Sequence, residues 1–206
     1  MGDTIVNSRN WVRLFLSTLL VGGITTSITG FALRWGDYKE FFLSFDIVEI
    51  LSILLWLVGV GFIFSIISQM GFFAYLTIHR FGLGIFRTAA LWNAIQIVLI
   101  LFVIFDLVYF RYQLFAAEGE SVVPYLMVAF FLLLFSAAVA YIKMKQTNKM
   151  AFIPALFFMT VVTTVEWVPA LRVNEGDWLY LMLIPLLICN AYQLLLLSKL
   201  SQAKKS

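Results

Sequence analysis

Six charged side chains lie within or close to long apolar segments of this chain and could form a site on one side of a lipid bilayer. The carboxylates are Glu49, Asp106 and Glu166, and the arginines expected at the same level are Arg34, Arg111 and Arg172. An ionisable group in a membrane indicates function by default. Because the planar guanidinium fork pairs well with carboxylates, we interpret the six as an outer ion-pair cluster that ties helix ends together. The alternative is a proton or cation pathway, which would more readily use deep carboxylates without matching arginines.

Five side-chain amides form a second polar set, expected nearer the cytoplasmic side. They are Gln69, Asn93, Gln96, Asn190 and Gln193. Asn93 and Gln96 are three residues apart and share a helix face, as do Asn190 and Gln193. Such amides hydrogen-bond across helices at roughly 0.6–2 kcal/mol each, which predicts an inner polar cluster that holds the bundle together. The alternative is a small polar pocket open to the cytoplasm.

The segment 71–84 extends the second apolar stretch beyond what a bilayer requires. A helix of about 29 residues would run about 43 Å, against a hydrocarbon core of about 30 Å. We expect its end to leave the membrane on the cytoplasmic side, with aromatic side chains at the interface and the His79 and Arg80 side chains in water. The candidate partner-contact residues are Phe72, Phe73, Tyr75, His79, Arg80 and Phe81. The alternative is an interfacial linker that binds no partner.

Catalytic and metal-binding patterns are weak. Cys189 is the single cysteine and His79 the single histidine, which argues against an internal disulfide and a histidine-based metal site. We find no nucleophile–base pair typical of an intramembrane enzyme, and we therefore expect no enzymatic activity, metal or cofactor. The net charge of +3 is explained by basic loops on one side of a membrane, so we expect no nucleic-acid partner, and no small-molecule substrate is identified.

The elements that must position these residues are six long stretches without charge. The composition is 63% hydrophobic and 12% charged, far from the balance of a soluble domain. The sequence predicts an all-α membrane protein, a bundle of six transmembrane helices forming a single integral membrane domain over residues 1–206. The expected spans are about 11–33, 48–70, 86–108, 121–142, 150–171 and 178–198. Gly22, Thr26 and Gly30 recur every four residues in the first span and favour close helix contact, within this chain or with a partner.

The distribution of basic residues predicts that both termini lie in the cytoplasm. Alternate loops and tails divide the lysines and arginines ten against four. The ten on the predicted cytoplasmic side are Arg9, Arg13, Arg80, Arg87, Lys143, Lys145, Lys149, Lys199, Lys204 and Lys205, and the four on the other side are Arg34, Lys39, Arg111 and Arg172. The expected location is therefore the cell membrane, with the bilayer as the solvent.

Three segments carry a resemblance to a known family: Asn10–Phe15, Gly71–Gly84 and Phe105–Tyr112. With them, the whole chain resembles the KinB-signalling pathway activation family, the KbaA-type membrane proteins of spore-forming bacteria. The resemblance implies a multi-pass membrane regulator that promotes signalling through a membrane-bound sensor histidine kinase at the start of sporulation. It brings no active-site residues with it. The alternative function is a small membrane transporter or channel that uses a polar cluster between helices.

Overall fold

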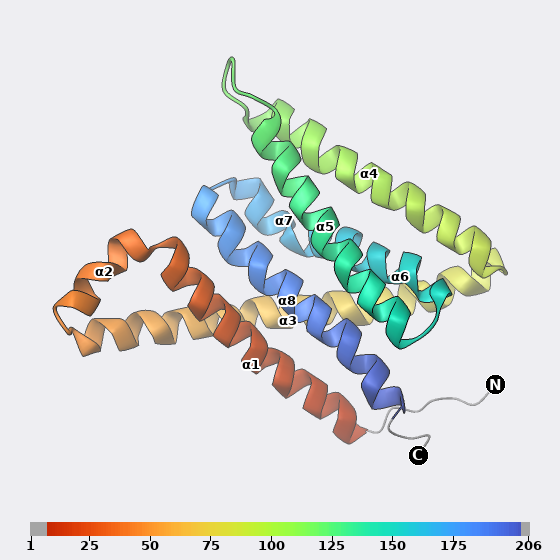
Figure 1. Ribbon diagram of the computed structural model, residues 1–206, viewed down its shortest axis with the longest axis horizontal. Helices are drawn as coiled ribbons and strands as arrows, with labels where there is room; N and C mark the ends of the chain where they lie inside the picture. The colour runs from red at the N-terminus through yellow and green to blue at the C-terminus, as the bar shows by residue number, and fades with distance from the viewer. Residues whose placement is uncertain (1–7, 203–206) are drawn as a thin grey trace. The chain divides into compact units, whose positions relative to one another are not determined.

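A computed structural model describes residues 8–202, with side chains described from residue 9 to residue 197 (Figure 1). All regular elements in this range are helices. The long ones are α1 (Ser8–Leu33), α3 (Ile47–Phe86), α4 (Ala89–Phe115), α5 (Val123–Gln146) and α8 (Gly176–Gln202). The shorter ones are α2 (Trp35–Leu43), η1 (Lys149–Ala151), α6 (Phe152–Phe157), η2 (Phe158–Val162) and α7 (Thr163–Val173).

Six helical segments in this range are long and apolar enough to cross a membrane, which confirms the predicted number. They are Arg9–Leu33, Ile47–Phe86, Ala89–Phe115, Val123–Gln146, Lys149–Val173 and Gly176–Leu197. The direction in which the chain crosses the membrane, and the cytoplasmic position of both ends, stay predictions. Lys204 and Lys205, which contribute to that prediction, lie outside the described residues.

Two of the six segments differ from simple spans. Helix α3 runs unbroken for 40 residues, about 60 Å, and passes the expected end of the second span at residue 70. It stops where Arg87 adopts a left-handed backbone (φ 58°) and the Thr88 hydroxyl accepts a hydrogen bond from the backbone N–H of Leu91 at 3.3 Å to begin α4. The fifth segment is a composite of η1, α6, the π-helical η2 and α7, in which the wider turn of η2 shifts the register of the helix face.

The chain forms two compact units. Unit 1 comprises residues 1–71 and 166–206, and unit 2 comprises residues 72–165. In unit 1, α1 packs along α8 and crosses α3 where small residues meet. A Cβ atom added at Gly22 would lie 2.7 Å from the carbonyl oxygen of Gly61, so the small residues of the first span are used for packing inside this chain.

Unit 2 has an aromatic core. Tyr75 at the C-terminal end of α3 contacts Phe157 and Phe158, with ring centroids 6.3 Å and 4.9 Å apart, and Trp92 of α4 stacks on Phe86.

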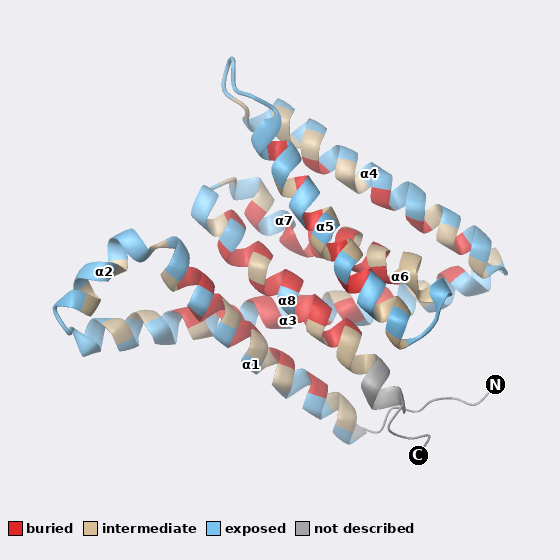
Figure 2. Cartoon of the chain, viewed as in Figure 1, coloured by how far each residue is buried: buried red, intermediate tan, exposed pale blue. Residues whose placement is uncertain are grey.

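Burial differs strongly between helices, with α8 largely buried and α4 mostly exposed (Figure 2). The exposed apolar side chains of α4 suit a lipid environment rather than water.

Candidate functional site

A chain of hydrogen bonds runs through the interior of unit 1 and contains its one buried carboxyl group among the described residues. The Gln193 Nε2 group donates to the Ser68 hydroxyl at 2.7 Å, and that hydroxyl donates to Oδ1 of Asn190 at 2.7 Å. Asn190 Nδ2 then donates to Oε2 of Glu166 at 2.6 Å. All donors point toward the carboxyl group, so the four residues form one directed network, which we call the buried polar chain.

The elements place these residues by simple periodicity. Asn190 and Gln193 are three apart on α8 and share a face, and Ser68 faces them from α3. Glu166 reaches the same point from α7, where it lies against Gly71. A Cβ atom at residue 71 would overlap Oε1 of the Glu166 carboxyl group, so glycine is the residue that permits this approach.

Burial makes the buried polar chain energetically important. The side chains of Ser68, Asn190 and Gln193 are inaccessible, and Glu166 is 7% exposed. Two oxygens, Oε1 of Glu166 and Oε1 of Gln193, have no hydrogen-bond partner. A buried unpaired acceptor costs about 1–3 kcal/mol, so the network both holds three helices together and retains unsatisfied acceptors at its two ends.

The predicted partner of Glu166 was wrong. Glu166 was expected to pair with an arginine of the outer ion-pair cluster, and it is instead hydrogen-bonded to an amide of the inner polar cluster. The remaining members are scattered: Glu49, Asp106 and Arg172 are exposed, Asp106 and Arg111 belong to unit 2, and the others belong to unit 1. The Arg111 guanidinium lies 5.3 Å from the ring centroid of Tyr125.

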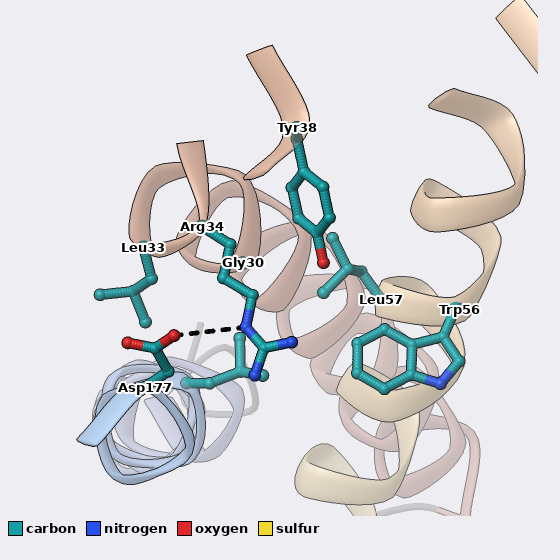
Figure 3. Close-up of a pocket in the computed structure, with 8 residues that line it drawn as sticks. Gly30, Leu33, Arg34, Tyr38, Trp56, Leu57 and Asp177 are labelled. Atoms are coloured by element: carbon teal, nitrogen blue, oxygen red, sulfur yellow. Dashed lines mark ion pairs between the residues drawn. The ribbon is translucent and has the colours of Figure 1, made fainter. Parts of the chain in front are cut away.

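Arg34 has an acidic partner that the prediction did not include. Its Nε lies 3.5 Å from Oδ2 of Asp177, in a cleft walled by Tyr38 and Trp56 (Figure 3). The cleft holds about 220 Å³ of empty space but none wide enough for a water molecule. The two charged side chains are 33% and 54% exposed, so the pair contributes at most about 1 kcal/mol. We interpret this cleft as a joint between the ends of α1 and α8 rather than a ligand site.

The inner amides divide between the two units. Gln69, Asn190 and Gln193 lie in unit 1, where Gln69 Nε2 is 3.4 Å from the Ser65 hydroxyl. Asn93 and Gln96 lie in unit 2, where the Gln96 side chain is inaccessible and neither of its amide atoms has a hydrogen-bond partner. The sequence pattern identified polar positions in the core but did not identify which of them share a network.

The C-terminal end of α3 faces inward more than was predicted. Phe72 and Tyr75 are buried, and the Tyr75 hydroxyl donates to the Pro154 carbonyl at 3.0 Å. His79 was expected in water, but it is half-buried and its Nδ1 accepts a hydrogen bond from Trp92 Nε1 at 3.0 Å. Residues three or four apart turn toward the core of unit 2, which explains this burial.

The opposite face of this helix end remains accessible. Phe73 is 44% exposed, Phe81 is 65% exposed, and Arg80 is exposed beside it. Three of the six candidate contact residues therefore have exposed side chains. We call them the exposed α3 face.

Sequence reasoning missed three residues that matter here: Ser68, Gly71 and Trp92. Ser68 and Gly71 are three apart, so their shared helix face was a usable signal. Trp92 gave no such signal, because its pairing with His79 requires the turn between α3 and α4. Among residues 8–202, no group of acidic, histidine or cysteine side chains gathers in a way that could hold a metal ion.

Comparison with known proteins relates the chain to one family. A family described as KinB-signalling pathway activation in sporulation matches residues 22–200. The KinB-signaling pathway activation protein of Bacillus subtilis (strain 168) is 55% identical over 194 residues, which cover 94% of this chain and 98% of that protein. No solved structure matches. With the family match and this relative spanning nearly the whole sequence, the chain belongs to the KinB-signalling pathway activation family.

Proposed function

We propose that this protein is a multi-pass membrane regulator that promotes signalling through a membrane sensor histidine kinase at the start of sporulation. The observation that carries the proposal is the joint occurrence of family membership and six membrane-length apolar helices in one chain. The relative is named for activation of the KinB signalling pathway. A chain dominated by apolar helices would meet a membrane kinase most directly within or beside the bilayer.

The protein acts in this proposal without catalysing a reaction of its own. The support is the geometry of the buried polar chain, which has one carboxyl group and no paired base. The Oε1 atom of Glu166 lies against the backbone of Gly71, where a substrate would need space. A regulator needs instead a stable bundle and an accessible contact surface.

The exposed α3 face is the proposed contact surface for the kinase. Aromatic and arginine side chains are enriched at binding hot spots, and Phe73, Arg80 and Phe81 supply both types. They stand on a helix of about 60 Å, about twice the thickness of a hydrocarbon core, so its end is a candidate to project beyond the membrane. The inward side of the same helix end is held to the core of unit 2 by the hydrogen bonds of Tyr75 and His79.

Site-specific photo-cross-linking in cells tests this surface. A photoreactive amino acid at Phe81 should give a cross-link to the sensor kinase, identified by mass spectrometry. Phe130 on α5 is the matched control, because it is 62% exposed against 65% for Phe81, and it should give a much weaker kinase cross-link. Equal kinase cross-linking from the two positions, or none from Phe81, would rule out the exposed α3 face as the contact surface.

A further inference from the structure

The exposed side of α1 joins two arginines to a row of apolar side chains. Arg9 and Arg13 are exposed at the start of the helix. The apolar residues follow at intervals of four and are 54–66% exposed: Val12, Leu16, Leu20, Ile24 and Ile28. Side chains four apart form one inclined ridge on a helix surface, so a continuous apolar track leads away from the arginines.

The opposite side of α1 is fully used by packing in unit 1. Leu14, Thr18 and Thr26 are 0–2% exposed, and Gly22 meets Gly61 of α3. This side also faces α8, along which α1 packs. The exposed ridge is therefore a separate surface, left for whatever surrounds the helix bundle.

The arginine end of the ridge is hollowed. A shallow hollow of about 740 Å³ lies against Arg9, Asn10, Val12, Arg13 and Leu16, and none of the described residues that line it is acidic. A guanidinium group binds phosphate oxygens through its fork of donors, and the Asn10 amide adds a further possible donor. The occupant that matches two positive charges leading into an apolar track has an anionic head and a long hydrocarbon tail.

We infer that this hollow binds an anionic phospholipid, with its phosphate between Arg9 and Arg13 and an acyl chain along the Val12–Ile28 ridge. A zwitterionic phospholipid offers the same phosphate, but its ammonium group offsets the attraction to the arginines. Free phosphate offers the charge without the tail. Each basic residue beside an anionic lipid surface strengthens lipid binding by electrostatic attraction. Loss of two such residues should weaken the affinity about ten- to thirtyfold.

Native mass spectrometry of the purified full-length protein tests the inference. Delipidated protein in detergent is titrated with phosphatidylglycerol, with phosphatidylcholine of the same chains, or with inorganic phosphate. We expect phosphatidylglycerol to bind at least about tenfold more tightly than phosphatidylcholine, and inorganic phosphate not to compete with it. Absence of a preference for phosphatidylglycerol in the unaltered protein would overturn the site.

Two paired variants locate the binding. Arg9→Gln with Arg13→Gln should remove the preference for phosphatidylglycerol, whereas Lys143→Gln with Lys145→Gln, the same loss of charge on α5, should retain it. Leu16→Ala with Leu20→Ala should weaken the binding of both lipids alike, because this double change shortens the apolar track without changing the charge. An equal loss from the arginine and lysine pairs would show that overall charge decides binding. Competition by inorganic phosphate at the same concentration as the lipid would show that the acyl chain adds nothing to binding along the ridge. Either result would overturn the proposal.

Discussion

At the scale of single residues, the amide of Asn190 is the centre of the buried polar chain. It donates to Glu166 and accepts from Ser68, so its replacement leaves polar groups on two other helices unsatisfied. Glu166 stands at one end and receives a single hydrogen bond on Oε2. The position of each residue in this chain therefore predicts how much its loss should cost.

Asn190→Leu should destabilise the protein by about 1–3 kcal/mol, because it removes both hydrogen bonds and leaves buried groups unpaired. Glu166→Gln should cost less than about 1 kcal/mol, because the glutamine oxygen accepts the same bond from Asn190. Thermal unfolding in detergent, followed by circular dichroism, measures both. A loss from Glu166→Gln as large as that from Asn190→Leu would mean that the carboxylate charge, and not its hydrogen bond, stabilises this site.

Gly71 gives a second residue-scale prediction. Gly71→Ala should destabilise the protein by about 1–3 kcal/mol, because the new Cβ overlaps the Glu166 carboxyl group. Gly59→Ala is the matched control on the same helix, since nothing lies within 4 Å of its Cβ position, and it should be neutral or stabilising by up to about 1 kcal/mol. Similar unfolding temperatures for the two variants would contradict the close approach of Glu166 to Gly71.

At the scale of elements, the sequence predicted the helices better than it predicted their partners. The length of the stretches without charged residues identified all six membrane-length segments, because length and apolarity are local properties of the sequence. The depth at which a side chain lies within the bundle is not a local property of the sequence. Glu166 lies seven residues before the end of α7 and Asn190 fourteen after the start of α8, which on upright helices separates them by about 10 Å along the axis. Helix inclination and side-chain length remove this separation.

Helix α3 shows the same limit on one element. A long apolar stretch predicted its extension beyond residue 70. Which face of that extension packs inward within unit 2 depends on Trp92 and Pro154, which are distant in sequence. Aromatic residues were therefore all expected at an interface, although Phe72 and Tyr75 are core residues. The exposed α3 face is what remains once these contacts are known.

A double substitution tests that face. Arg80→Ala with Phe81→Ala should change stability by less than about 1 kcal/mol, because both side chains are exposed, and should reduce kinase-dependent reporter expression severalfold. His79→Ala should instead lower stability by about 1 kcal/mol, because the variant loses the hydrogen bond from Trp92. Unfolding temperature and reporter expression, measured on the same variants, separate the two effects. Unchanged reporter expression in the double variant would exclude the exposed α3 face from signalling.

At the scale of the whole molecule, the predicted orientation in the membrane rests on the distribution of lysine and arginine. In a Cys189→Ser background, cysteines at Glu118 and Glu175 should react with an impermeant thiol reagent in intact cells, and a cysteine at Gln146 should react only after lysis. All three positions lie in or beside the turns that join membrane-length helices. The reverse labelling pattern would invert the chain and move the start of α1, with Arg9 and Arg13, to the outer leaflet.

The central claim is that the protein acts through a membrane sensor kinase, and a genetic measurement in cells tests it most directly. The chain is expressed from an inducible promoter in cells that lack their own copy, with the sensor kinase either present or deleted, and a phosphorelay-dependent reporter is measured. Induction should raise reporter expression severalfold when the kinase is present and should have no effect when it is deleted. An equal rise in the two strains would contradict the account.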